Sequence, residues 1–306
     1  MERSSNDTWD VATSVGVTAT MVASARAAAS RQTNPIINDP FAEPLARAAG
    51  VELFARLASG DLEFSDIGSG WFVDFFAIRA RFFDGFFPEA SSAGIRQAVI
   101  VGSGLDSRAY RLKWPTGNIL YEIDQPAVIA FKGSTLSRLG VLPATELRTV
   151  DTDLRHDWPT ALRKAGFDST APTAWMLEGL MIGYLPADAQ TRMLDEITAL
   201  SAPGSRLIAD HLPGGSKSIG SLLQTVGENW RQLGLDVDFG GLTYSHESND
   251  AELHLQIRGW NTSARSLTDL LNAARMKAGD MDTSPNGQGA IKYLIATRNA
   301  VMASHG

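Results

Sequence analysis

Cysteine is absent from this chain of 306 residues. Its absence excludes disulfide bonds, thiolate nucleophiles and zinc–thiolate sites, so the fold must depend on its hydrophobic core. No hydrophobic run approaches the ~20 residues that a helix needs to cross a bilayer. The N-terminus also lacks the basic residues before an apolar stretch that mark a secretory signal. These absences predict a cytoplasmic protein without a membrane span, because a cysteine-free chain fits a reducing compartment.

Basic residues are outnumbered by acidic ones. The chain has 27 Lys and Arg and 34 Asp and Glu, which gives a formal net charge of −7. Proteins that coat a nucleic-acid backbone usually have the opposite sign, because phosphates are neutralised by Lys and Arg. We therefore expect no nucleic-acid partner. The five histidines form no H-E-x-x-H or similar ligand spacing, and we predict no metal site.

Hydrophobic residues make up 44% of the chain, which is ample for a packed core. Residues 1–93 have the pattern of helices, with a strongly aromatic helix over 71–87 that we expect Pro88 to end. From residue 94 on, short apolar runs alternate with helical stretches, which is typical of a parallel sheet covered on both faces. We expect a single domain over 1–306, with a helical cap at 1–93, an α/β core at 94–306 and a glycine-rich lid inserted at about 213–250.

The expected strands of this core are 97–101, 119–123, 146–150, 174–177, 206–209, 253–257 and 291–297. The expected helices of the core lie at 125–139, 159–165, 187–200 and 266–278, with one more at 219–233 inside the lid.

A glycine turn follows the first of these strands. The strand at 97–101 runs into Gly102-Ser103-Gly104, and such a turn lets the backbone approach a ligand closely and directs helix N–H groups at it. The dinucleotide motif G-x-G-x-x-G has a third glycine where this chain has Ser107. On the turn alone, a strand–helix connection without a ligand remains an alternative.

Acidic residues follow the next two strands. Asp124 lies 22 residues after Gly102, close to the spacing of a carboxylate that accepts both ribose hydroxyls. Asp153 follows the strand at 146–150, where an acid can accept from an adenine amino group while Leu154 packs on the ring. Helix capping is the alternative for both acids. Three strand ends converging on one crevice nevertheless favour a nucleoside ligand.

Four motifs occur in a characteristic order: GSGLDSR at 102–108, YEIDQP at 121–126, DTDL at 151–154 and EGLMIGYL at 178–185. Together they resemble the leucine carboxyl methyltransferase-like superfamily, and most closely its bacterial branch of S-adenosyl-L-methionine-dependent methyltransferases. The resemblance spans most of the chain and is weakest over 213–250. It implies the class I methyltransferase fold, which is Rossmann-like: a seven-stranded, mostly parallel sheet with one antiparallel strand, after a helical cap.

The resemblance also implies which residues bind the cofactor S-adenosyl-L-methionine. Asp124 would bind the ribose, Asp153 and Leu154 the adenine, and Gly102 the methionine part. Glu178 and Tyr184 would lie near the reactive end, and Arg79 would hold the methionine carboxylate. Arg26 stands roughly where the carboxyl methyltransferases have a lysine that contacts the cofactor. The full predicted cofactor set is Arg79, Gly102, Gly104, Asp124, Asp153, Leu154, Glu178 and Tyr184.

The helical periodicity gives independent support for Arg79. It shares one helical face with Phe72, Phe76, Phe83 and Phe86, at steps of three and four. An unpaired charge on such a face would cost several kcal/mol, so it needs a partner. We favour a ligand carboxylate, and pairing with a structural Asp or stacking on a Phe is the alternative.

The predicted function is methyl transfer from S-adenosyl-L-methionine by in-line displacement, to a carboxylate or another small-molecule acceptor. A carboxylate is already ionised, so it needs no general base. Trp71, Phe75 and Phe87 could line a pocket for an apolar carboxylic acid, although their helical spacing favours core packing for most of them. A nicotinamide-dependent oxidoreductase and a non-catalytic cofactor-binding protein remain as alternative functions. Ser107 and the lack of a Tyr-x-x-x-Lys pair argue against the oxidoreductase. We assume a monomer.

Overall fold

Helices form the N-terminal part of the computed structural model, which describes residues 15–213, 226–228, 230–231, 233–234, 250–284 and 287–300. The small side chains of α1, such as Ala23, Ala25 and Ala27, are buried and let the neighbouring helices approach closely. The elements of this part are α1 (Val15–Ser30), α2 (Ala42–Ala48), α3 (Glu52–Ser59), the 3-10 helix η1 (Phe64–Ile67) and α4 (Trp71–Ser92).

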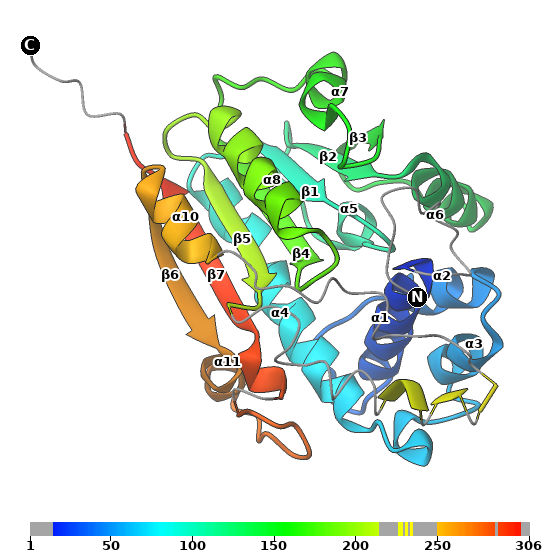
Figure 1. The fold of residues 1–306 in the computed structure, drawn as a ribbon. Helices are drawn as coiled ribbons and strands as arrows, with labels where there is room; N and C mark the ends of the chain where they lie inside the picture. The colour runs from blue at the N-terminus through cyan, green and yellow to red at the C-terminus, as the bar shows by residue number, and fades with distance from the viewer. Residues whose placement is uncertain are drawn as a thin grey trace, which may run out of the picture.

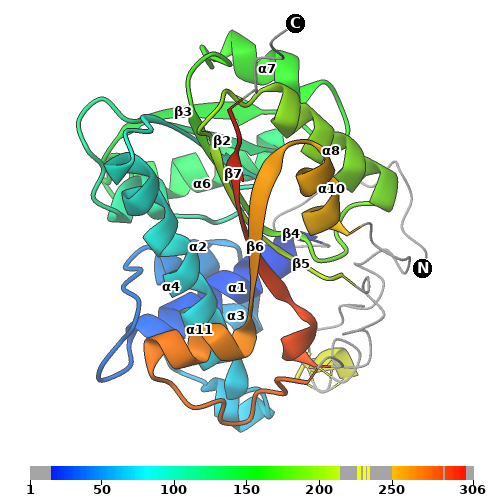
Figure 2. The same cartoon turned by 90° about the vertical axis from the view of Figure 1, so that its left-hand side faces the viewer.

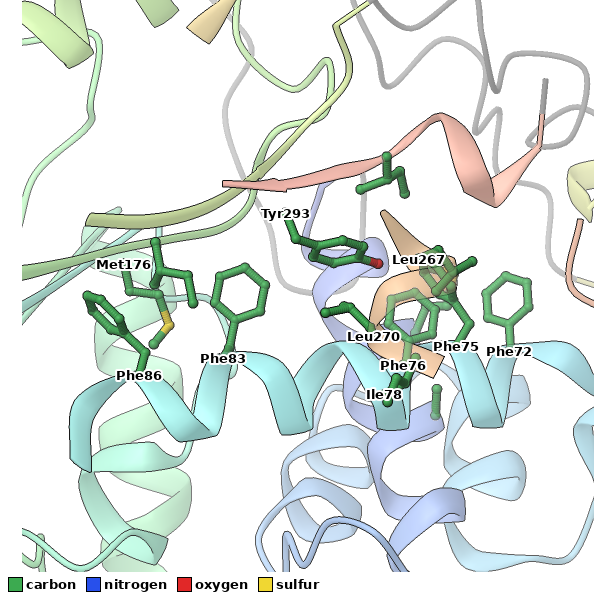
Figure 3. Close-up of a cluster of buried hydrophobic side chains, with 14 of the residues drawn as sticks. Phe72, Phe75, Phe76, Ile78, Phe83, Phe86, Met176, Leu267, Leu270 and Tyr293 are labelled. Atoms are coloured by element: carbon green, nitrogen blue, oxygen red, sulfur yellow. The ribbon is translucent and has the colours of Figure 1, made fainter. Parts of the chain in front are cut away.

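Helix α4 extends further than the sequence predicts. It runs through Pro88 to Ser92 instead of ending before the proline. Proline removes one helical N–H, but Phe86, Phe87 and Ala90 are buried on either side of it and keep this turn packed against the rest of the protein. The predicted aromatic face is buried as well, and Figure 3 shows its side chains meeting Met176, Leu267, Leu270 and Tyr293 from other parts of the chain.

A seven-stranded sheet forms the core (Figure 1). Its order is β3-β2-β1-β4-β5-β7-β6, and β7 runs antiparallel to both β5 and β6 while the β1–β5 neighbours pair in parallel. One antiparallel strand in a mostly parallel sheet is the class I methyltransferase arrangement that the motifs imply, and this prediction is confirmed. The strands are β1 (Gln97–Val101), β2 (Ile119–Asp124), β3 (Glu146–Asp151), β4 (Thr173–Met181), β5 (Arg206–His211), β6 (Trp260–Ser266) and β7 (Lys292–Arg298).

Both faces of the sheet are covered, which explains why its central strands are mostly apolar. Side chains alternate along β1, so Ala98 and Ile100 join the core shared with α4 and α11, while Val99 and Val101 join the core shared with α7 and α8. The remaining helices are α5 (Arg108–Arg111), α6 (Pro126–Arg138), α7 (Trp158–Lys164), α8 (Ala187–Ala199), α10 (Ala251–Ile257) and α11 (Leu267–Ala274), with the 3-10 helix η4 (Gln288–Ala290) before β7.

One predicted strand is wrong. Residues 253–257 lie in helix α10, which begins where the Asp250 side chain accepts hydrogen bonds from the N–H groups of Glu252 and Leu253. The alternating apolar residues suggest a strand, yet Leu253 and Ile257 are exposed. The sixth strand is β6, which lies at the edge of the sheet (Figure 2) and is mostly polar and exposed, so it lacks the apolar signal of the central strands.

The predicted lid at about 213–250 falls mostly outside the described residues, as does most of the predicted helix at 219–233. Within it, Trp230 is buried against the N-terminal helices. Its ring centroid lies 5.6 Å from that of Phe54 and 5.2 Å from that of Phe72, and its indole N–H donates to Ser69 Oγ. No helix in the described ranges is both long and apolar enough to span a membrane.

Candidate active site

A cavity lies at the carboxyl ends of the parallel strands, between the sheet and helices α1 and α4. Open α/β sheets bind their ligands at this edge. The structure brings all the residues of the predicted cofactor set together around it: Arg79, Gly102, Gly104, Asp124, Asp153, Leu154, Glu178 and Tyr184. Arg26 lines it too, and its guanidinium is bound by Asp39 and by the carbonyl oxygen of Leu105.

The glycine turn is tied to the neighbouring strand β2. Gly102 and Gly104 have φ angles of +67° and +47°, in the left-handed region that side chains disfavour. The Gly102 N–H donates to the carbonyl oxygen of Ile123, and the Gly104 N–H donates to Asp124 Oδ2 over 2.6 Å. A Cβ at position 102 would lie 3.3 Å from Leu180 Cδ1. The turn therefore needs glycine and leaves its backbone open to the cavity.

Asp124 holds its carboxylate at the rim of this turn. Oδ2 accepts from Gly104, and Oδ1 accepts from the N–H of Gln125 over 2.7 Å, so each oxygen keeps a further lone pair for a ligand. Burial raises the pKa of this carboxyl above its ordinary value. The N-cap residue of α6 is Gln125, and its side chain makes no capping hydrogen bond. Asp124 is therefore not the N-cap of this helix, which was its alternative role.

Asp153 and Leu154 lie at the end of β3. Arg155 donates to the Asp153 carboxylate from Nε over 3.0 Å and from Nη2 over 2.6 Å. Burial raises the pKa of Asp153, but the hydrogen bonds from Arg155 outweigh it and hold the pKa below its usual range. Helix α7 is capped by Asp157 instead. Asp153 therefore faces the cavity as a carboxylate, in the position where an adenine amino group is predicted.

Arg79 is almost fully buried, with 4% of its surface exposed, and it has structural partners. Nε donates to Asp210 Oδ2 over 2.7 Å, and Nη1 lies 3.2 Å from Glu178 Oε1. Its guanidinium carbon also lies 5.8 Å from the centroid of the Phe76 ring. The structural pairing that the sequence left as an alternative is thus present. Nη2, however, has no hydrogen-bond partner among the described residues, so one donor group remains for a ligand.

Gly179 keeps the space beside that free nitrogen. A Cβ at this position would lie 2.9 Å from Arg79 Nη2, and the φ angle of +75° is again left-handed. Its N–H donates to Asp210 Oδ1 over 2.6 Å. Gly179 lines the cavity, so Arg79 Nη2 lies at the wall of the predicted ligand site.

Glu178 is held between two arginines. Oε1 faces Arg79, and Oε2 accepts from Arg108 Nη1 over 2.6 Å. Arg108 is 2% exposed and also binds Asp84 and Asp106. These pairs belong to a buried network that joins the N-terminal helices to the sheet, formed by Arg26, Asp39, Arg79, Asp84, Asp106, Arg108, Arg111, Glu178 and Asp210.

Aromatic side chains from α4 form another wall of the cavity. Trp71 and Phe75 line it, as the pocket hypothesis requires, together with Phe72 and Phe76. Phe87 does not line it. That residue is buried three turns further along the helix and packs against Trp114, with ring centroids 4.9 Å apart. The core-packing alternative is therefore correct for Phe87.

Sequence reasoning missed three residues near this site. Asp210 directly follows the predicted strand at 206–209, so the strand-end rule that found Asp124 would also have found it. Arg108 lies inside a recognised motif but had no role assigned. Gln288 lines the cavity from η4, and no local sequence signal marks it.

Comparisons with known proteins place this chain in a family. The model of the family described as leucine carboxyl methyltransferase matches residues 19–198. A protein of Mycobacterium ulcerans is 54% identical over 98% of this chain and 99% of its own, and one of Mycobacterium sp. strain JLS is 50% identical over 97% and 100%. Both carry the provisional name S-adenosyl-L-methionine-dependent methyltransferase, in agreement with the predicted cofactor.

A crystal structure of a DUF574 family protein from Streptomyces avermitilis shares the fold. It superposes with a TM-score of 0.50 at 12% identity, covering 90% of this chain and 97% of that one. The family model covers more than half of the chain, and the relatives match nearly all of it. This chain therefore belongs to the leucine carboxyl methyltransferase family, which confirms the resemblance found in its motifs.

Proposed function

We propose that this member of the family binds S-adenosyl-L-methionine and transfers its methyl group to a carboxylate oxygen of a small apolar acid. The observation that carries the proposal is that one cavity is lined by every predicted cofactor residue and by the aromatic wall of α4. Adjacent sites for the two reactants are what a direct transfer needs, because holding reactants in line supplies much of the rate enhancement.

The residues of the cavity fit the cofactor. Asp124 has free lone pairs for the ribose hydroxyls, the Gly102 turn leaves backbone open to the methionine part, and Arg79 Nη2 is a buried donor without a partner, as a bound carboxylate would require. When bound, S-adenosyl-L-methionine supplies a methyl group on a positively charged sulfur, whose transfer to a carboxylate needs no proton movement.

The charges around the cavity suit that positive sulfur. Its lining contains the carboxylates of Asp106, Asp124, Asp153, Glu178 and Asp210 and the guanidinium groups of Arg26, Arg79 and Arg155. The negative groups are in excess, and in a partly buried site they attract a cation more strongly than they would in water. Arg79 and Arg108 fix the orientation of Glu178, so its carboxylate stays in place at the predicted reactive end.

The proposed reaction can be tested without knowing the acceptor. The protein is incubated with methyl-labelled S-adenosyl-L-methionine and the small-molecule fraction of a bacterial extract, and the labelled products are treated with mild base. Methyl esters release labelled methanol under these conditions, whereas methyl ethers and methylamines do not. We expect base-labile label that extracts into an organic solvent. Base-stable products would exclude a carboxylate acceptor, and an absence of transfer by protein that binds the cofactor would favour the non-catalytic alternative.

Nicotinamide binding is the other alternative to be tested. In the structure, Ser107 Oγ donates to Asp39 Oδ1 over 2.8 Å, so the side chain that replaces the third glycine of the dinucleotide motif joins the turn to the N-terminal helices. We expect S-adenosylhomocysteine to raise the melting temperature and NADH or NADPH to leave it unchanged. Stabilisation by a nicotinamide nucleotide alone would contradict the proposal.

As the pH is lowered, cofactor affinity should begin to fall at a higher pH than it would if the ribose were bound by an aspartate of ordinary pKa. Burial raises the pKa of Asp124, so its carboxylate takes up a proton above the usual ~3.9 and then loses acceptor strength for the ribose hydroxyls. The lowered pKa of Asp153 keeps that carboxylate ionised over the same range. Titration calorimetry with S-adenosylhomocysteine from pH 8 to pH 4.5 should show Kd rising in the wild type, with a flatter profile in Asp124→Asn. Parallel profiles would show that another group is responsible.

A further inference from the structure

Gln288 is a buried polar side chain that the cofactor prediction does not use. It begins η4, just before β7, and only 3% of its surface is exposed. Because β7 is antiparallel, with Lys292 opposite His211 of β5, its N-terminal end lies at the same edge of the sheet as the carboxyl ends of the parallel strands. Gln288 and Ile291 therefore reach the cavity from a segment that contributes none of the predicted cofactor residues.

The orientation of the Gln288 amide follows from its one hydrogen bond. Oε1 accepts from the backbone N–H of Asp282 over 2.7 Å. A backbone N–H can only donate, so the atom facing it must be the oxygen and not the nitrogen. The amide nitrogen is thereby directed elsewhere, and it makes no hydrogen bond within the described part of the chain. Gln288 lines the cavity, so these amide N–H groups can donate to a ligand bound there.

Much of the cavity lining away from the predicted cofactor residues is apolar. This apolar lining comes from α1, from α4 before Arg79, from residue 182 and from the segment before β7. Gln288 and a few residues of α1 are its exceptions. It includes Met21, Val22, Trp71, Phe72, Phe75, Phe76, Ile182 and Ile291. Arg79, whose guanidinium lies over Phe76 and pairs with Glu178, marks the junction between this apolar wall and the charged strand ends.

We infer that Gln288 is the residue that selects the methyl acceptor, donating from Nε2 to one oxygen of its carboxylate while the aromatic wall holds the apolar body. The inference rests on the proposed function and adds the group that recognises the substrate. A neutral amide suits this role because it binds one oxygen without neutralising the carboxylate, which leaves the second oxygen negatively charged and free to react. The ligand class is a monocarboxylic acid with an aliphatic or aromatic body.

Paired probes test this inference on protein saturated with S-adenosylhomocysteine. Decanoate and decan-1-ol have the same apolar chain and differ in the carboxylate. We expect the wild type to bind decanoate at least tenfold more tightly than the alcohol. Gln288→Glu keeps the oxygen that Asp282 requires but places a negative charge at the acceptor, so it should lower decanoate affinity at least tenfold and leave the alcohol unaffected. Gln288→Leu should bind the two probes with similar affinity.

Controls separate the possible failures. Gln256→Glu introduces the same charge at an exposed position of α10 and should change neither probe's affinity. Affinity for S-adenosylhomocysteine should be the same in all variants, which also shows that each is folded. Wild-type protein that fails to bind S-adenosylhomocysteine would contradict the proposed function. Protein that binds it but binds neither probe, or that binds decanoate equally well after Gln288→Glu, would overturn the role of Gln288 alone.

Discussion

Replacing Asp124 by alanine should weaken the binding of S-adenosylhomocysteine at least about 30-fold, which corresponds to ~2 kcal/mol for hydrogen bonds to a charged group. The variant removes the carboxylate predicted to accept from both ribose hydroxyls. It also removes the acceptor of the Gly104 N–H, so the glycine turn loses its tie to β2. Titration calorimetry gives the affinity, and thermal unfolding shows whether the variant remains folded.

The neighbouring strand supplies a matched control. Asp151 of β3 stands opposite Asp124 in the register of the sheet, but it is exposed and does not line the cavity. Asp151→Ala should leave the affinity within a factor of two, although it removes the same charge a few ångströms away. Unchanged affinity in folded Asp124→Ala, or an equal loss in both variants, would show that the ribose is not bound at the end of β2.

Replacing Arg108 by methionine should lower the free energy of unfolding by roughly 3–5 kcal/mol. Arg108 is 2% exposed and binds Asp84, Asp106 and Glu178. Without the guanidinium, three carboxylates lose a positively charged partner. Because the site is buried, water cannot solvate these negative charges in its place. Urea denaturation of the two proteins measures the difference.

An exposed arginine provides the comparison for Arg108. Arg47 pairs with Glu43 one helical turn away over 3.5 Å, and its side chain is 62% exposed. Arg47→Met should change the free energy of unfolding by less than about 1 kcal/mol, because solvent screens surface pairs. A similarly small effect for Arg108→Met would mean that the buried network contributes little to holding the N-terminal helices on the sheet.

Much of the sheet could be predicted because its inner strands are largely buried on both faces. β1, β2, β4, β5 and β7 contain apolar runs, and the expected positions overlap them. β3 lies at one edge and is only partly buried, but it keeps Leu147 half-buried and Val150 buried, and it was also predicted. β6 could not be found in this way, since an edge strand exposes most of its side chains and carries polar residues. The alternating apolar residues at 253–257 led to the wrong prediction of a strand. Of these apolar residues only Leu255 is buried, and the Asp250 side chain caps a helix that begins there.

The residues of the candidate site that directly follow a strand could be predicted from the sequence. Asp124 and Asp153 follow strands directly, so parallel pairing alone places them together. The partners of Arg79 were not predictable, because Asp210 lies 131 positions further along the chain and only the sheet order brings it to α4. Gln288 depends on the reversed direction of β7 for its place at the cavity. Such long-range contacts leave no local pattern in the sequence.

A crystal structure of the protein with S-adenosylhomocysteine tests the central claim most directly. The account predicts ribose hydroxyls on the Asp124 carboxylate, the adenine amino group at Asp153 with its ring on Leu154, and the amino-acid carboxylate on Arg79 Nη2. The sulfur should then face Glu178 and the aromatic wall of α4. Ligand bound elsewhere, or bound in the cavity with Asp124 and Arg79 out of contact, would contradict it.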